Sequence, residues 1–214
     1  MGDKQAGNAM RRHLLVTNDY PPKVGGIQSY LWELWRRLPA EDVAVHTTPY
    51  NGTESFDAQQ DYTLTRSKEP VLLPHRWVRR RAAKLAAQHQ AEMIIWDPAL
   101  PVGLAAPRVK LPYAVVLHGA EVTIPGRLPI TRQLLARVLR RASLVICAGQ
   151  YAADEAQRAA KQELPTVIIP PGVDTERFKP LDSDQRRTVR QKLGLDETAP
   201  LVVSVSRLVP RKGM

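Results

Sequence analysis

Short apolar runs recur along the chain and alternate with segments that have helical periodicity or good helix formers. Almost every position inside these runs is apolar, which is typical of parallel strands buried on both faces. The runs predict strands over residues 13–17, 43–47, 62–66, 93–97, 113–117, 144–148, 167–169 and 201–205. Helices are predicted over residues 27–38, 77–90, 102–108, 128–141, 151–161 and 185–193.

This alternation predicts an α/β fold, a doubly wound Rossmann-like parallel sheet with helices on both faces. Ligands of such sheets bind beyond the carboxyl ends of the strands. The loops 19–26, 97–101 and 118–126 therefore form the expected binding edge. The first loop lacks the Gly-x-Gly-x-x-Gly fingerprint, which disfavours a dinucleotide site.

The first loop ends in a glycine pair, Gly25 and Gly26, at the start of a predicted helix. Without a Cβ, backbone N–H groups can approach an anion closely, and a helix N-terminus favours negative charge. The pair is therefore either part of a phosphate site or an ordinary turn between a strand and a helix.

Composition changes divide the chain into a polar tail over 1–12, a domain over 13–180 and a segment over 181–214. The last predicted strand, 201–205, is followed by a basic, glycine-containing loop at 206–213. This pattern is typical of the start of a second α/β unit. We therefore expect the sequence to be truncated at the first strand of a second domain.

The chain carries 31 Lys and Arg against 21 Asp and Glu, a net charge of +10. This excess favours anionic partners, namely phosphorylated substrates, acidic lipid surfaces or nucleic acid. No nucleic-acid recognition motif is visible and aromatic residues are sparse, so a nucleic-acid partner is disfavoured. No apolar run approaches the roughly 18 residues of a membrane span.

The lone cysteine, Cys147, lies in an apolar run and is expected to be a core residue. A single cysteine and a polar N-terminus favour a reducing, cytoplasmic location, with any membrane attachment peripheral and on the inner face of the plasma membrane. The histidines lack metal-ligand spacing, so no metal and no cofactor are expected.

A basic segment begins the second predicted helix. Its members are Trp77, Arg79, Arg80, Arg81 and Lys84. One interpretation is an amphipathic helix on an anionic membrane surface, with Trp77, Val78 and Leu85 as apolar anchors. The other is a solvated helix face whose few apolar residues point toward the sheet.

Four motifs, in this order along the chain, are similar to those of the family 4 retaining glycosyltransferases of the GT-B fold. They lie at 17–30 (Thr-Asn-Asp-Tyr-Pro-Pro-Lys-Val-Gly-Gly-Ile-Gln-Ser-Tyr), 118–121 (His-Gly-x-Glu), 170–180 (Pro-Pro-Gly-Val-Asp-x-x-x-Phe-x-Pro) and 206–213 (Ser-Arg-Leu-Val-Pro-Arg-Lys-Gly). The first and last most resemble the actinobacterial GDP-mannose-dependent phosphatidylinositol-mannoside mannosyltransferases of the PimB type. The resemblance implies that the chain is the N-terminal, acceptor-side domain of such an enzyme.

For the donor, the resemblance implies a hydrogen bond from His118 to the sugar near the reacting carbon. It also implies that Gly25 and Gly26 bind the donor phosphate from this domain, and that Arg207 and Lys212 bind it from the second domain. The planar fork of an arginine and the point charge of a lysine both suit phosphate oxygens.

For the acceptor, the resemblance implies contacts from Asp19, Gln28 and Glu121. The residues alone leave two alternatives open, an Asx turn at Asp19 and a helix cap at Glu121. The chain departs from the PimB-type pattern at Asp97, within a Trp-Asp-Pro-Ala stretch in place of a Trp-Phe-Gly-Ala-like one, and at Ala120 in place of histidine. Both departures lie in loops of the acceptor side.

The resemblance implies retaining transfer of a hexosyl, here mannosyl, group from a nucleotide sugar such as GDP-mannose to a glycolipid such as a phosphatidylinositol mannoside. It also implies independence of metals. Another nucleotide sugar, a soluble acceptor, or a non-catalytic basic membrane- or nucleic-acid-binding α/β domain are the alternatives. Because the missing second domain would hold most of the donor nucleotide, this fragment alone is expected to be inactive.

Overall fold

The computed structural model describes residues 11–205. In this part of the chain seven strands form one sheet with the order β3-β2-β1-β4-β5-β6-β7, and all neighbouring strands pair in parallel. The strands are β1 (His13–Thr17), β2 (Val43–Thr47), β3 (Thr63–Arg66), β4 (Met93–Asp97), β5 (Tyr113–Leu117), β6 (Leu144–Cys147) and β7 (Thr166–Ile168). The predicted parallel sheet is confirmed.

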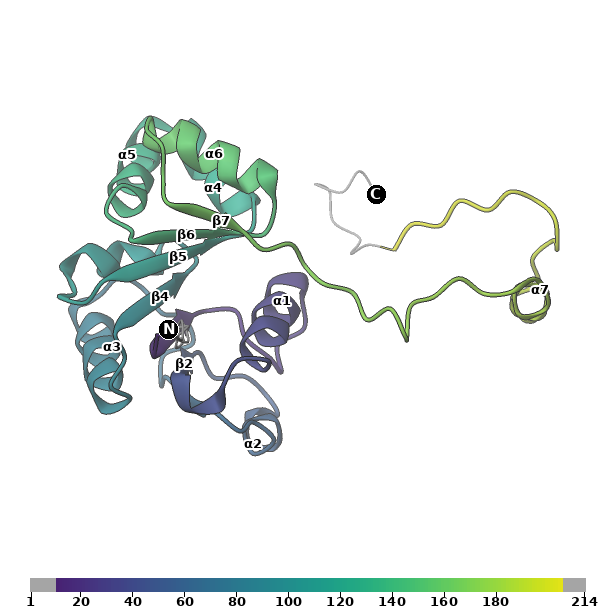
Figure 1. Cartoon of the computed structure of the whole chain (residues 1–214), viewed down its shortest axis with the longest axis horizontal. Helices are drawn as coiled ribbons and strands as arrows, with labels where there is room; N and C mark the ends of the chain where they lie inside the picture. The colour runs from purple at the N-terminus through teal and green to yellow at the C-terminus, as the bar shows by residue number, and fades with distance from the viewer. Residues whose placement is uncertain (1–10, 206–214) are drawn as a thin grey trace, which may run out of the picture. The chain divides into compact units, whose positions relative to one another are not determined.

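Helices cover both faces of this sheet, and Figure 1 shows α1 and α3 on opposite sides of it. On one face α1 (Gly26–Trp35) packs Tyr30, Leu31 and Trp35 against the apolar strand residues. The other face is covered by α3 (Arg76–Gln88), η2 (Val102–Arg108), α4 (Ala120–Arg127), α5 (Pro129–Leu139) and α6 (Gln150–Ala160). The predicted doubly wound arrangement is therefore confirmed, and each face has its own apolar core.

Three connections contain helical segments that the apolar pattern did not predict. Residues 118–126, predicted as a loop, are mostly helix α4, even though Pro125 and Gly126 lie within it. A short helix, α2 (Thr53–Asp57), and a 3₁₀ turn, η1 (Ala40–Asp42), lie in polar connections. As predicted, Cys147 is a buried free thiol in β6.

The chain divides into two compact units, one ending at Gly172 and one beginning at Val173, whereas the predicted first domain ends at residue 180. In the second unit, α7 (Ser183–Lys192) begins with a capping box between Asp182 and Gln185. The backbone N–H of Gln185 donates to the carboxylate of Asp182 over 2.8 Å. These caps satisfy N–H groups that the first turn of a helix leaves free.

The predicted strand over 201–205 is wrong. These residues form no strand, and Val202 is 96% exposed. Their β-branched side chains favour extended backbone, but a strand also needs a neighbouring strand for its N–H and C=O groups. Within residues 11–205 no strand pairs with this segment.

Candidate active site at the carboxyl edge of the sheet

The strand register brings a threonine and an aspartate together at the carboxyl ends of two central strands. Thr17 ends β1 and is paired in register with Asp97, which ends β4. The Thr17 hydroxyl donates a 2.7 Å hydrogen bond to Asp97 Oδ2. His118 directly follows β5, and its Nε2 lies 2.8 Å from Asp97 Oδ1. The three side chains therefore form one hydrogen-bonded cluster at the predicted binding edge.

Burial controls the electrostatics of this cluster, since the side chain of Asp97 is 1% exposed and that of His118 is 10% exposed. Burial raises the pKa of Asp97, against the effect of hydrogen bonds from His118 and Thr17. Burial alone would lower the pKa of His118, but the hydrogen bond and charge of Asp97, with the charges of Glu121 and Asp19, raise it. The pKa of both groups is therefore raised, for Asp97 by burial and for His118 by the neighbouring negative charges.

A second contact orients the imidazole ring. The ring of Tyr30, on α1, meets the ring of His118 edge to face, with 5.3 Å between centroids and 89° between planes. The Tyr30 hydroxyl donates a 2.7 Å hydrogen bond to the carbonyl of Ile169. His118 Nδ1 has no hydrogen-bond partner within residues 11–205, and it is not among the fully buried polar atoms without partners. Nδ1 is thus the ring nitrogen that a ligand can reach.

Asp19 is connected to the same cluster through the backbone. Its N–H donates a 2.9 Å hydrogen bond to the hydroxyl of Thr17. Its Oδ1 accepts hydrogen bonds from Gln28 Nε2 at 2.6 Å and from Lys23 Nζ at 3.0 Å. The structure therefore brings Asp19 and Gln28 together, and their contact with an acceptor stays a prediction. Lys23 adds a cation that the sequence motifs had not singled out.

The two glycines of the first loop occupy different environments. A Cβ on Gly25 would overlap Oε1 of Gln28, whereas a Cβ on Gly26 would meet nothing within 4 Å. The first backbone hydrogen bond of α1 runs from Ser29 to the carbonyl of Gly25, so the preceding N–H groups have no acceptor within the helix. Gly26 therefore leaves an open approach to a helix N-terminus that suits an anion. The donor-phosphate role of both glycines stays a prediction.

Glu121 holds the turn between β5 and α4. Its Oε1 accepts hydrogen bonds from the backbone N–H groups of His118 and Gly119, the latter at 2.9 Å. Gly119 has φ +139°, a conformation that other residues rarely adopt. The carboxylate of Glu121 thus fixes the backbone of His118. The predicted acceptor contact of Glu121 is not tested by this geometry.

Asn18 joins the site loop to the segment that precedes α3. Its Nδ2 donates to the carbonyl of Leu72 at 3.0 Å, and its Oδ1 accepts from the Leu72 N–H at 2.6 Å. The backbone of Leu72 therefore has both its polar groups paired with one side chain. This contact fixes the loop before α3 against the end of β1.

Arg66, at the end of β3, contacts the loop that follows β1. Its guanidinium makes a fork to the carboxylate of Asp57 and donates to the carbonyls of Thr48 at 3.0 Å and Pro21 at 2.7 Å. Its side chain is 13% exposed. The conformation of the Pro21 loop therefore depends on a largely buried ion pair.

Several of these residues were missed by sequence reasoning. Thr17, Asp97 and Arg66 share one signal, because each is a polar residue that ends a predicted strand. That signal marks the binding edge but does not say which side chains pair, since pairing depends on strand order and register.

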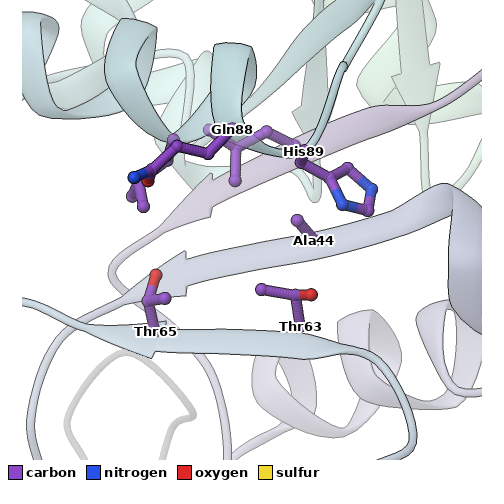
Figure 2. Close-up of a pocket in the computed structure, with 7 residues that line it drawn as sticks. Ala44, Thr63, Thr65, Gln88 and His89 are labelled. Atoms are coloured by element: carbon purple, nitrogen blue, oxygen red, sulfur yellow. The ribbon is translucent and has the colours of Figure 1, made fainter.

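A cavity of about 160 Å³ lies apart from this cluster, on the sheet face that α3 covers. Figure 2 shows Gln88 and His89 on one side of it and Ala44, Thr63 and Thr65 on the other. None of its lining residues belongs to the Thr17–Asp97–His118 cluster. Over residues 11–205 no group of three or more His, Cys, Asp or Glu side chains is arranged to hold a metal ion.

The basic segment lies on α3, with Arg80, Arg81 and Lys84 exposed and Arg79 half-buried. Trp77 is 52% exposed and its ring stacks on His75 with 4.5 Å between centroids.

Val78 is buried with Ala82 and Ala86 in the core, so its prediction as a membrane anchor is wrong. The physical reason is helical spacing, which places these three on the face toward the sheet. Leu85 packs against the same core. Arg207 and Lys212 lie outside the described residues.

Comparisons with known proteins relate the chain to one enzyme family. A model of Glycosyltransferase Family 4 matches residues 24–177. The GDP-mannose-dependent alpha-(1-6)-phosphatidylinositol monomannoside mannosyltransferase of Mycobacterium tuberculosis is 38% identical over 214 residues, which cover 95% of this chain and 55% of the relative. The corresponding enzyme for the monoacylated lipid from Corynebacterium glutamicum is 32% identical, covering 96% and 55%. The chain thus spans about half the length of these relatives.

Solved structures share the fold. The Anabaena protein HepE, determined with UDP, has a TM-score of 0.64 and 21% identity over 86% of this chain and 50% of its own. Sucrose-phosphate synthase from Thermosynechococcus elongatus has a TM-score of 0.64 and 18% identity over 95% and 57%. At these identities the likeness shows the fold alone.

Proposed function

Because the chain belongs to Glycosyltransferase Family 4, we propose that it is the acceptor-side domain of an enzyme that transfers mannose from GDP-mannose to a phosphatidylinositol mannoside. Relatives that are 38% and 32% identical carry this activity in their names. One structural observation carries the proposal. The carboxyl edge of the sheet presents both the accessible Nδ1 of His118 and the N-terminus of α1 at Gly26, which no side chain caps. The proposal includes a second domain that completes the donor site, with Arg207 and Lys212 as ligands of the donor phosphate.

These groups suit the transfer chemistry. The bond between the anomeric carbon and the phosphate oxygen breaks, and its electron pair stays with the nucleoside diphosphate. An acceptor hydroxyl forms the new bond to that carbon, and its proton leaves with the diphosphate. Fixed donors near the leaving phosphate stabilise the developing negative charge, which is the role proposed for the N–H groups at Gly25 and Gly26.

A transfer assay on the full-length protein tests this function. We expect GDP-mannose and a phosphatidylinositol mannoside to give lipid with one further mannose, detected by mass spectrometry. Residues 1–214 alone should give no product, because the donor site is shared between domains. Turnover of a soluble sugar with no lipid product, or of another nucleotide sugar in preference to GDP-mannose, would contradict the proposed substrates.

We also propose that α3 meets the anionic surface of the membrane that holds the acceptor. Arg80, Arg81 and Lys84 are exposed beside Trp77, and the loop before α3 exposes Val71 and Leu73. Between residues 70 and 153 the acidic residues are Glu92, Asp97 and Glu121, and Asp97 is buried. This leaves the face of α3, η2 and α5 strongly basic, which favours anionic headgroups. No described helix is long and apolar enough to cross a membrane.

Charge removal on α3 tests this attachment. Each cation near an anionic membrane contributes about 1 kcal/mol, so the double variant Arg80→Gln/Arg81→Gln should bind phosphatidylglycerol vesicles roughly 30-fold more weakly. The matched control is Arg36→Gln/Arg37→Gln, which removes the same charge from the end of α1 on the other sheet face. Equal losses in a flotation assay for both variants would rule out a specific role for α3.

A further inference from the structure

We infer that Asp97 is a positioning residue for His118, which it holds with Nε2 toward the core and Nδ1 toward the ligand. That Asp97 positions His118 follows from the contacts alone. The effect of this positioning on sugar transfer rests on the proposed function. Asp97 itself touches no ligand position, because it is fully buried beneath the ring.

Both oxygens of the Asp97 carboxylate are occupied. Oδ2 accepts from Thr17 and Oδ1 faces Nε2 of His118. A carboxylate accepts but does not donate hydrogen bonds, so Nε2 carries the proton of this contact. The same register that pairs Thr17 with Asp97 therefore determines which nitrogen of His118, the residue after a third strand, faces the core.

The remaining groups around His118 make the arrangement rigid. Tyr30 from α1 contacts the ring at its edge, and Glu121 from α4 holds the backbone N–H of His118. Asp19, from the loop after β1, adds a negative charge that is paired with Lys23. With the ring fixed on three sides, Nδ1 is held in one direction.

Charge balance gives this arrangement a further consequence for a sugar donor. The anomeric carbon becomes positive as the phosphate leaves, so an isolated imidazolium next to it would be repelled. Beside the Asp97 carboxylate the imidazolium is part of a pair with no net charge. In the protonated ring, Nδ1–H can therefore donate a hydrogen bond to a sugar hydroxyl without adding net positive charge near the reacting carbon.

The test combines two variants and two measurements. Asp97→Asn keeps the shape of the contact and removes its charge, whereas Thr17→Val keeps the charge and removes the bond that orients it. In residues 1–214, the titration of His118, followed by NMR, should move to lower pH in Asp97→Asn. In the full-length protein the same variant should lose about 10- to 100-fold in kcat with little change in KM for the donor, because the contact matters most in the transition state.

The two measurements separate the possible outcomes. An unchanged titration of His118 in folded Asp97→Asn would overturn the inference, whatever the activity. If Asp97→Asn shifts the titration of His118 but the unmodified full-length protein transfers no mannose, the positioning role is supported and the proposed function is refuted. If Asp97→Asn fails to fold, Thr17→Val decides, since a changed ring titration with Asp97 present supports the coupling and an unchanged one overturns it.

Discussion

Under the proposed function, replacing His118 by alanine is expected to lower kcat for mannosyl transfer about 10²- to 10³-fold in the full-length protein, the range for loss of one donor aimed at a transition state. The loss arises because Nδ1 is the accessible nitrogen of a ring that Asp97 and Tyr30 hold in place. KM for the donor should change little, since a contact made mainly in the transition state affects kcat. Steady-state kinetics with radiolabelled GDP-mannose measures both constants.

The alanine variant leaves the buried carboxylate of Asp97 without one partner, so it also affects stability. His118→Gln separates the two effects, because the glutamine amide can still donate to Asp97. His75→Ala is the control, since His75 is exposed and stacks on Trp77 outside the cluster. Full activity of a folded His118→Gln protein would show that the imidazole takes no part in transfer.

Replacing Arg66 by alanine lowers the free energy of unfolding by about 3 kcal/mol, near the lower end for breaking a buried ion pair. The variant removes a fork to Asp57 and leaves the carbonyls of Thr48 and Pro21 without their donor. The two side chains are 13% and 25% exposed, so water recovers part of the loss. For a unit of this size the change corresponds to about 6–12 °C in Tm, measured by calorimetry.

A matched surface pair provides the control. Arg36 also donates two hydrogen bonds to a carboxylate, both to Oε2 of Glu33, but these side chains are about two-fifths exposed, at 38% and 42%. Arg36→Ala should therefore cost less than about 1 kcal/mol. Arg66→Lys should fall between the two, because an ammonium keeps the charge but not the fork. A loss at Arg66 no larger than that at Arg36 would contradict a supporting role for Arg66.

The sheet was predictable because most of its strands are nearly continuous apolar runs, although β3 contains a single apolar residue, Leu64. The same reasoning failed at 201–205, where the apolar composition is right but no strand lies alongside within the described residues. It also failed at α4, because Pro125 and Gly126 suggest a loop while the carboxylate of Glu121 supplies acceptors for the start of the helix. At 201–205 the described residues offer no partner strand, whereas at α4 a local contact from Glu121 to the preceding turn outweighs the preference of Pro125 and Gly126.

The binding edge was predictable in location but not in its pairings. His118 is recognisable because it directly follows an apolar strand and belongs to a motif. The role of Asp97 was not predictable, since it requires that β4 lie between β1 and β5 and that Thr17 stand beside it. The link from Asn18 to Leu72 similarly joins segments that are far apart in sequence.

The position of β1 and β4 within the sheet also determines how the site responds to thermal fluctuation. Both strands have a neighbour on each side, whereas β3 and β7 are the outer strands of the sheet. Local unfolding starts where backbone groups are least protected, so opening begins at β3 and β7 and reaches the centre last. We therefore expect the amides of Thr17 and Asp97 to be among the slowest to exchange in the domain. We expect the His118 cluster to stay assembled when the outer strands open.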